Sequence, residues 1–294
     1  MTAVHKNSSR VDTLCKNLPG SPGVYLFYGM HDELLYVGKS RSIRTRVRSH
    51  FASREERTMC RQVARVEARE TPGELGALLL ESDLIKSLRP IFNMRSRQRR
   101  RMIVAKRGRS REGYTTVSID AVENPDPAMA QSFLGLFRTR MQAKEFFAMT
   151  VRTHRLCPKL LGLERSSGSC FSYHLGRCSG ACIGSEEAEV YNARVEEAFA
   201  ERRIKAWPFP GAILIEEKSA LRNEAEVFIV DNWCLLYSFV YATDHHKLSI
   251  RGSHRFDYDS YKLLASYIFD PSHRDTLRGV SSEEIRNLLQ TLAA

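Results

Sequence analysis

The sequence contains no apolar run approaching the roughly 18 to 20 residues that a membrane-spanning helix needs. Residues 1–17 also lack the apolar stretch found at the centre of a secretory signal peptide. These two absences predict a cytoplasmic protein without a membrane partner. Because that compartment is reducing, the seven cysteines do not indicate a disulfide framework.

Acidic residues are in short supply. The chain has 45 lysines and arginines against 34 aspartates and glutamates, which gives a formal net charge of +11. Such an excess favours a polyanionic partner, above all nucleic acid, and a basic surface without any such partner is the alternative. Hydrophobic residues make up 43% of the 294 residues, which excludes wholesale disorder and predicts two or three packed domains.

Residues 18–98 are predicted to form a β-β-α-β-α unit. Val24–Tyr28 and Leu34–Val37 are apolar and aromatic runs of strand length, and the short polar stretch between them indicates a hairpin. A helix is expected over Ile43–Phe51 with Ser42 as its cap. A third strand is expected over Val63–Ala68, where apolar residues alternate weakly.

The next helix is predicted from its start signal. Thr71 would be the N-cap, Pro72 the first helical residue and Glu74 the third, which is the spacing of a capping box. The helix is expected to run to about Leu88, where an Arg-Pro pair closes it.

Glu81 lies within this predicted helix, and its neighbours one turn away are all apolar: Ala77, Leu78, Leu84 and Ile85. A carboxylate in an apolar stripe needs a cation, a hydrogen-bond donor or a raised pKa. One interpretation is a Mg²⁺ ligand, because a hard cation held by one carboxylate and several waters suits a phosphate substrate. The other is an ion pair with a nearby arginine.

The remaining residues divide into five segments by composition and pattern, and the whole chain is expected to have an α+β fold. The segments are an N-terminal arm (1–17), a basic linker with strands and a helix (99–150), a cysteine-rich segment (151–185), a helix and hinge (186–206) and an accessory domain (207–294). Before the hinge, a strand is predicted over Met102–Ala105, and helices over Phe133–His154 and Glu186–Lys205.

The last domain is predicted to be a small α+β unit. The runs GAILIEE, EVFIVDN and WCLLYSFV indicate successive strands. Two helices follow, over Ser260–Phe269 and Ser282–Ala293, and Ser281 with Glu284 forms a capping box for the second.

Basic residues follow the predicted hairpin at once. Arg46 and His50 lie four residues apart and therefore share a helix face, and Lys39 precedes them at the strand end. An arginine can stabilise charge on phosphate, and a histidine can move a proton near neutral pH. The simpler interpretation is contact with a DNA backbone. That role is expected of Lys39, Arg41, Arg44, Arg48, Arg95, Arg97, Arg99 and Arg100.

The elements GVY…YVG, GKS…RTRVRSHF and ESDLIKSLRPIFN, in this order, resemble the GIY-YIG nuclease domain in the form found at the start of UvrC. The resemblance covers Leu18 to about Asn93 and implies a small antiparallel sheet with flanking helices. It also implies a role for each polar position. Tyr25 or Tyr36 would act as, or position, the general base, Arg46 would stabilise the transition state, and Glu81 would hold one Mg²⁺ or Mn²⁺. Asn93 would brace the site, Lys39 would contact phosphate or activate a tyrosine, and His50 stands where relatives carry Tyr or His.

Four cysteines occur within 26 residues with the spacing C-x12-C-x7-C-x3-C: Cys157, Cys170, Cys178 and Cys182. In a reducing cell this pattern favours tetrathiolate metal binding, and both zinc and a [4Fe–4S] cluster accept four thiolates. Four small buried hydrophobic residues are the alternative. The segment resembles the cysteine-rich region of UvrC, which implies an iron–sulfur cluster with a structural or DNA-contacting role. The other three cysteines, Cys15, Cys60 and Cys234, are expected to be free thiols.

The resemblance implies a metal-dependent DNA endonuclease of nucleotide excision repair. It would incise the damaged strand of double-stranded DNA on the 3′ side of a lesion, in a complex with UvrB that UvrA loads. No acidic triad indicates a second nuclease domain, so 5′-side incision is not expected. Two alternatives are a stand-alone site-specific endonuclease and a non-catalytic, metal-stabilised DNA-binding adaptor.

Overall fold

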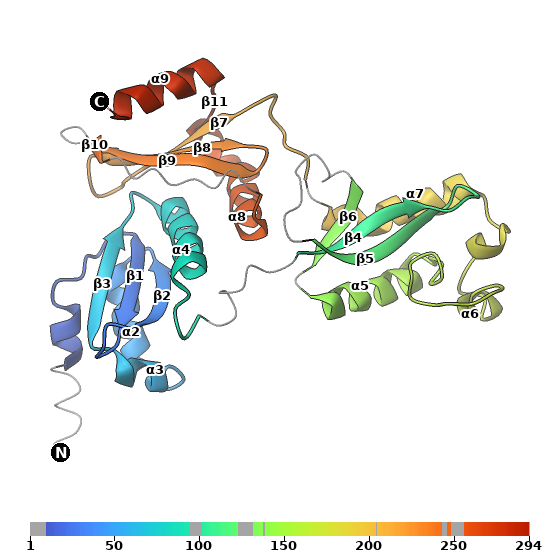
Figure 1. Cartoon of the computed structure of the whole chain (residues 1–294), viewed down its shortest axis with the longest axis horizontal. Coiled ribbons are helices and arrows are strands. Elements are labelled where there is room, and N and C mark those ends of the chain that lie inside the picture. Colours follow the sequence, from blue (N-terminus) through green and yellow to red (C-terminus); the bar gives the residue numbers. More distant parts are fainter. Residues whose placement is uncertain are drawn as a thin grey trace. The chain divides into compact units, whose positions relative to one another are not determined.

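A computed structural model describes residues 10–93, 102–122, 132–137, 139–203, 205–242, 246–247 and 256–293 (Figure 1). The chain divides into two compact units. The first unit combines Met1–Arg99 with Phe209–Ala294, and the second is Arg100–Pro208. Among the residues that the model describes, no helix has both the length and the apolar character needed to cross a membrane.

The N-terminal part of the first unit is a three-stranded antiparallel sheet with helices on both faces. Its strands are β1 (Gly23–Tyr28), β2 (Leu34–Ser40) and β3 (Arg65–Glu70), in the order β2-β1-β3. Its helices are α2 (Ile43–Ala52), α3 (Arg57–Gln62) and α4 (Glu74–Leu88). The expected β-β-α-β-α order is confirmed, with α3 as an additional short helix.

Alternation along β1 separates two small cores. Tyr25 and Phe27 pack with Ile43 and Val47 of α2 on one face of the sheet. The residues between them point to the other face, where Val24 and Leu26 join the residues of α4. Strand β2 forms one edge of this sheet. It contacts both α2 and α4, the helices that carry the predicted polar site residues.

Two predicted helix caps differ from the structure. The N-cap of α4 is Gly73, and the Thr71 hydroxyl instead donates to the Gly73 carbonyl, so the prediction of Thr71 as N-cap is wrong. Ser42 does occupy the N-cap position of α2, but its side chain makes no cap bond and contacts the Thr45 hydroxyl. In both helices, backbone amides of the first turn donate to acceptors other than the predicted cap side chain.

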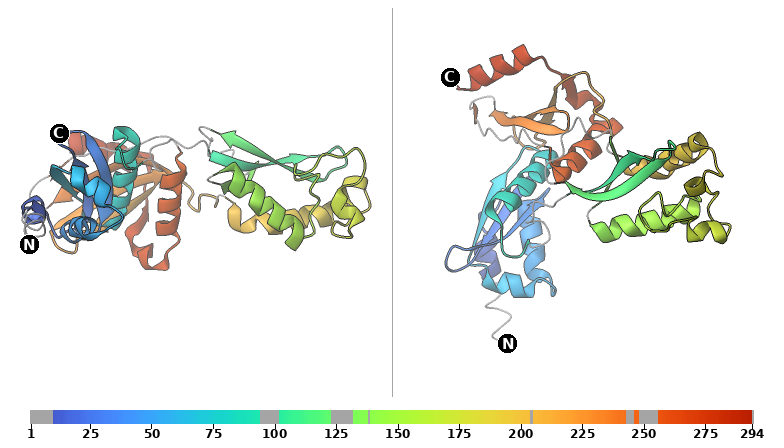
Figure 2. Two further views of the ribbon diagram at one scale, coloured as in Figure 1. Left: turned by 90° about the horizontal axis from the view of Figure 1, so that it is seen from below. Right: turned by 45° about the vertical axis from the view of Figure 1, so that its right-hand side comes forward.

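The C-terminal part of the first unit is a five-stranded antiparallel sheet in the order β10-β9-β8-β7-β11. Its strands are β7 (Ile213–Lys218), β8 (Glu224–Asp231), β9 (Cys234–Ala242), β10 (His246–Lys247) and β11 (Leu277–Gly279), and its helices are α8 (Tyr258–Ile268) and α9 (Ser282–Ala293). Helix α9 packs on one face of the sheet (Figure 2). The predicted Ser281–Glu284 capping box is confirmed by reciprocal hydrogen bonds.

The second unit is a three-stranded antiparallel sheet in the order β5-β4-β6, with helices packed against it. Its elements are β4 (Met102–Arg109), β5 (Thr115–Val122), β6 (Phe133–Phe137), α5 (Arg140–Thr153), α6 (Phe171–His174), the 3-10 helix η2 (Ala181–Ile183), α7 (Ala188–Phe199) and the 3-10 helix η3 (Ala200–Arg202).

The prediction of one helix over Phe133–His154 is wrong in its first part. Phe133–Phe137 is a fully buried strand, and a short apolar run of this kind cannot be told from a buried helix by its period. The helix begins after Thr139, whose side chain accepts a hydrogen bond from the Gln142 amide. Thr139 and Gln142 have capping-box spacing, so the sequence did contain the signal for this start.

Candidate active site

Five of the polar residues expected at the nuclease site line one cavity of about 470 Å³ at the end of β2: Tyr25, Tyr36, Lys39, Arg46 and Glu81. Ser40, Arg41 and Glu74 complete its lining. The cavity therefore combines three cations, two carboxylates and two phenols, which come from β1, β2, the turn after β2, α2 and α4. Such a mixture of charges suits an anionic ligand held together with a cation.

The hairpin register places the two tyrosines. Tyr25 pairs with Gly38, and Phe27 pairs with Tyr36 on the same face, so the Tyr25 and Tyr36 rings lie with their centroids 6.2 Å apart. A Cβ added at Gly38 would overlap the Tyr25 hydroxyl. The glycine of the YVG element is thus needed because a phenol lies directly over it.

Glu81 is held against the end of β2. The Lys39 amide donates a hydrogen bond to Glu81 Oε1 at 3.1 Å, and burial raises the pKa of this carboxyl. Within the described part of the chain, no ion pair within 4.0 Å of Glu81 occurs, so the arginine partner of the alternative interpretation is not found among these residues. A carboxylate that faces a cavity and has one backbone donor fits a divalent cation.

Glu74 was not singled out as a site residue from the sequence, yet it binds two of the cavity's cations. Its carboxylate lies 2.8 Å from Lys39 Nζ and accepts a hydrogen bond from Arg41 Nε at 2.6 Å. These partners lower its pKa against the opposing effect of burial. Glu74 precedes Glu81 by seven residues, two helical turns, so the helical period could have identified it.

His50 lies behind the tyrosines, fully buried. Its Nε2 is 2.6 Å from the Tyr25 hydroxyl, and its Nδ1 is 2.8 Å from Glu56 Oε2. Burial lowers the pKa of His50, although Glu56 opposes this shift, so the neutral imidazole is favoured. A carboxylate can only accept, so the proton lies on Nδ1, and Nε2 accepts from the Tyr25 hydroxyl.

Both tyrosines hold their protons in the absence of a cation. Burial is the main cause that raises the pKa of each phenol, and Arg46 opposes the rise in both. Tyr25 is only 1% exposed, whereas Tyr36 is partly exposed to the cavity. The Tyr25 hydroxyl also lowers the pKa of Tyr36. Tyr36 is therefore the phenol that a solvent molecule in the cavity can reach.

Three further predicted residues, Asn93, Arg44 and Arg48, are not among those that line the cavity. Asn93 is outside it, and its amide donates to the Val37 carbonyl and accepts from the Val37 amide, both at 2.9 Å, along the free edge of β2. Arg44 and Arg48 are exposed on α2, where Arg44 donates to the Leu18 carbonyl and Arg48 pairs with Asp12. The remaining predicted DNA contacts, Arg95, Arg97, Arg99 and Arg100, lie outside the described residues.

The second unit brings the four expected cysteines together. The Sγ atoms of Cys157, Cys170 and Cys182 lie within 4.8 Å of one another. The Cys178 thiol is hydrogen-bonded to both Cys157 and Cys170, and the bond with Cys157 lowers the pKa of Cys178 to about 6.

The protein backbone donates to two of these sulfurs. The Cys170 amide donates to Cys182 Sγ at 3.3 Å, and the Gly180 amide donates to Cys178 Sγ at 3.5 Å. Amide donors of this kind stabilise thiolates bound to a metal. The four residues thus fit a tetrathiolate centre, and three of them belong to the hydrophobic core of this unit. The remaining cysteines, Cys15, Cys60 and Cys234, are buried free thiols.

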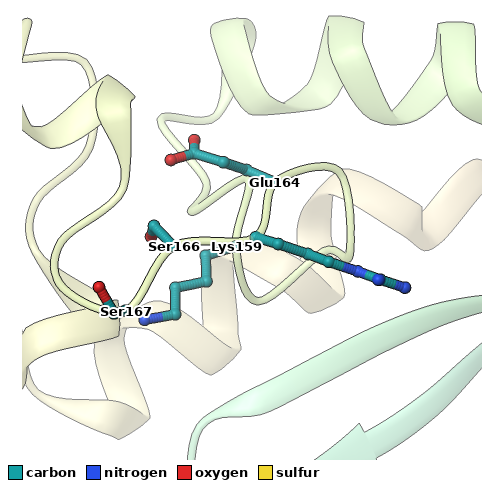
Figure 3. A pocket seen from close by; sticks show the side chains of 5 residues that line it. Lys159, Glu164, Ser166 and Ser167 are labelled. Atoms are coloured by element: carbon teal, nitrogen blue, oxygen red, sulfur yellow. The ribbon is translucent and has the colours of Figure 1, made fainter.

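The loop between Cys157 and Cys170 carries an open, shallow hollow of about 480 Å³ (Figure 3). Lys159, Glu164, Arg165, Ser166 and Ser167 line it. Lys159 Nζ is already engaged with the Gly168 carbonyl at 2.8 Å.

Three family models match the chain, one for each part of it. They are the UvrC-like GIY-YIG domain over residues 21–94, the UvrC/Cho excinuclease middle domain over residues 109–201, and the excinuclease Cho C-terminal domain over residues 212–281. The "Excinuclease cho" of Escherichia coli is 34% identical over 277 residues, which cover 93% of this chain and 91% of that protein. That of Salmonella typhimurium is 35% identical over 266 residues, with 89% and 88% covered.

Longer relatives and a solved structure match parts of the chain. The "UvrABC system protein C" of Desulforudis audaxviator is 34% identical over 201 residues, which cover 62% of this chain and 30% of that protein. The GIY-YIG N-terminal endonuclease domain of UvrC from Thermotoga maritima, solved with its catalytic magnesium, is 27% identical. The matched region covers 28% of this chain and 94% of the Thermotoga maritima domain, with a TM-score of 0.26.

The matched domains define a nuclease of the GIY-YIG class joined to the middle domain of the UvrC and Cho excinucleases. With a C-terminal domain that also matches, and with 34% identity over nearly its whole length, the chain belongs to the excinuclease Cho family.

Proposed function

We propose that this protein incises damaged double-stranded DNA on the 3′ side of a lesion, within a complex that UvrB forms with the DNA and that UvrA loads. The observation that carries the proposal is the single cavity in which Tyr36, Lys39, Arg46 and Glu81 converge. Family membership supports DNA repair as the setting. The side of incision and the UvrB partner belong to the proposal alone.

Glu81 is the residue that holds a divalent cation, Mg²⁺ or Mn²⁺, in this proposal. When bound, such a cation polarises the scissile phosphate and favours deprotonation of the attacking water. Arg46, exposed at the cavity, binds the non-bridging oxygens as charge grows on the phosphorus. Lys39 binds an adjacent phosphate, for which it must exchange its partner Glu74. The bond that breaks joins phosphorus to the leaving oxygen, and a water oxygen replaces it.

The proton of the attacking water leaves through the phenols and His50. Tyr36 is the phenol that faces the cavity, and the hydroxyl of Tyr25 lies next to it. The Tyr25 hydroxyl donates to His50 Nε2, so a proton arriving at Tyr25 displaces the original one onto the imidazole. The imidazolium that forms is stabilised by the Glu56 carboxylate on its other nitrogen.

The rest of the chain serves substrate binding in this proposal. Arg41 at the cavity and the exposed Arg44 and Arg48 of α2 contact phosphates without reading sequence. Damage recognition comes from UvrA and UvrB. The four cysteines hold a [4Fe–4S] cluster, for which zinc is the alternative, and Asn93 keeps the edge of β2 in place through its two bonds to Val37.

The test is an incision assay on a duplex with one bulky adduct, labelled at the 5′ end of the damaged strand. UvrA, UvrB, ATP and Mg²⁺ are added with the full-length protein, and undamaged duplex is treated in parallel. We expect one nick 3′ to the adduct that depends on UvrB. Cutting of undamaged duplex at a fixed sequence would instead indicate a stand-alone nuclease. Binding of the complex without any nick, under all divalent metals tried, would indicate an adaptor.

Replacing Glu56 by alanine is expected to slow incision about 10- to 100-fold, because an imidazole without its carboxylate partner loses its orientation and the stabilisation of its charged form. Of the charged groups near His50, Glu56 raises its pKa and Arg46 lowers it. Loss of Glu56 therefore lowers the pKa of His50 further, and the acid limb of the pH–rate profile should move to lower pH.

The adjacent Glu55 provides a matched control, because it is exposed and one residue away. Glu55→Ala should keep both the rate and the profile. A Glu56→Ala enzyme that is slower with an unchanged acid limb would show that Glu56 supports the fold of this loop and does not act through His50.

A further inference from the structure

The first turn of α4 receives its cap from the C-terminal sheet. The N-cap residue Gly73 has no side chain to offer, and the Thr71 side chain is turned to the Gly73 carbonyl. Glu217 of β7 supplies the acceptor instead. Its carboxylate accepts from the Leu75 amide at 2.8 Å and from the Gly76 amide at 2.9 Å. A carboxylate here also complements the positive end of the helix dipole.

Two glycines make this contact possible. A Cβ added at Gly73 would overlap the Glu217 carboxyl, and one added at Gly76 would overlap the carboxylate of Glu226. Glu217 and Glu226 are directly paired residues of β7 and β8, so they lie side by side on one face of the C-terminal sheet. The opposite face carries Val227 and packs with α9. The glycines of the PGELG segment are therefore explained by a surface about 140 residues away along the chain.

This arrangement is not explained by stability alone. Glu226 is 2% exposed, and burial raises the pKa of Glu217 in spite of its backbone donors. A buried carboxylate next to a half-buried one opposes folding. The geometry that this pair imposes on α4 is therefore a reason for its presence. An apolar residue could cover the same surface of α4 but could not fix its amides.

The C-terminal domain also holds the other end of α4. Lys86, in the last turn, lies 2.5 Å from Asp257 and 3.2 Å from Asp259 at the start of α8. The helix is thus bound near both ends. Of the two carboxylates that α4 presents to the nuclease cavity, Glu81 lies between these anchors and Glu74 lies next to the first of them.

We propose that the C-terminal domain sets the position of α4 in the nuclease site, with Glu217 as the positioning residue that places Glu81 for its divalent cation. This inference rests on the proposed role of Glu81 as the metal-holding residue. Glu217 touches neither substrate nor metal and acts through the first turn of the helix. The fold of the C-terminal sheet would thereby be part of the catalytic apparatus.

The test measures Mn²⁺ affinity in the full-length protein by titration calorimetry, and nicking rate as a function of Mg²⁺ concentration. Removing an outer residue that orients a metal ligand typically weakens affinity about 10- to 100-fold. We expect a loss of that size in Glu217→Ala, with most of the nicking rate recovered at saturating metal. Glu217→Gln keeps one acceptor oxygen, so its Mn²⁺ affinity should lie between that of Glu217→Ala and that of the unaltered protein. Lys218→Ala, on an exposed neighbour of the same strand, should match the unaltered protein.

Two further measurements separate the possible failures. If Glu81→Ala keeps the Mn²⁺ site, the proposed role of Glu81 fails and the inference falls with it. If Glu81→Ala loses the Mn²⁺ site while Glu217→Ala keeps full affinity, the proposed positioning role of Glu217 is overturned and the role of Glu81 stands. Hydrogen exchange of the Leu75 and Gly76 amides confirms that the cap is lost, and Asp257→Asn tests the second anchor if Glu217→Ala does not fold.

Discussion

Glu81→Ala is expected to reduce nicking of the adduct-bearing duplex by at least about 10³-fold while leaving DNA affinity almost unchanged. Removal of one preorganised group that stabilises transition-state charge costs about 10²- to 10³-fold, and loss of the metal would remove the activation of water as well. DNA affinity should persist because it depends on exposed cations such as Arg44 and Arg48, which neutralise phosphates independently of the metal.

Asp83 is the matched control for this substitution. It lies two residues further along α4, and its side chain points to solvent. Asp83→Ala should incise at the rate of the unaltered protein. The experiment compares single-turnover nicking and fluorescence-detected DNA binding for the three proteins at one Mg²⁺ concentration. Nicking by Glu81→Ala within tenfold of the unaltered rate would sink the assignment of Glu81.

Local patterns in the sequence sufficed for the nuclease sheet and for the residues of its cavity. The apolar and aromatic runs Val24–Tyr28 and Leu34–Val37, with the short polar stretch between them, predict both strands and their hairpin. Glu81 was conspicuous as a carboxylate in an apolar stripe, and the structure places it at the rim of a core that includes Leu84 and Ile85. Each of these inferences needs only neighbours within two helical turns or one hairpin.

The parts that were missed depend on contacts between distant segments or on loops. No local signal links Glu217 to the start of α4, so the Thr-Pro-Gly-Glu sequence by itself predicts a self-contained cap that the structure does not contain. Glu56 lies in the segment after α2, where no helical period relates it to His50. Strand β6 was joined to α5 because five consecutive buried residues have no period of their own.

Cys178→Ala is expected to have the other large effect, loss of the metal centre together with cooperative folding of the second unit. Cys157, Cys170 and Cys178 belong to the same hydrophobic core as the strands and helices of this unit. Binding free energy at structural zinc sites amounts to about 10 to 16 kcal/mol and is coupled to folding. Three remaining thiols cannot complete a tetrathiolate set, so a large part of that stabilisation should disappear.

Cys234→Ala is the matched control, because Cys234 is equally a buried free thiol but lies in the C-terminal sheet. Metal content is measured after anaerobic purification, as iron and acid-labile sulfide or as zinc. The control should retain the metal of the unaltered protein, whereas Cys178→Ala should lose it. Thermal unfolding should then show an early transition in Cys178→Ala alone.

The same measurement decides between the two metals and between a metal site and a plain core. Iron with sulfide would establish the cluster, and one zinc per chain would establish the simpler site. If the unaltered protein carries neither, and Cys178→Ala unfolds at an unchanged temperature, the four cysteines are packing residues. Three sulfurs within 4.8 Å of one another, those of Cys157, Cys170 and Cys182, argue for the metal, and so do the backbone amides that donate to Cys178 and Cys182, because amide donors favour thiolates over thiols.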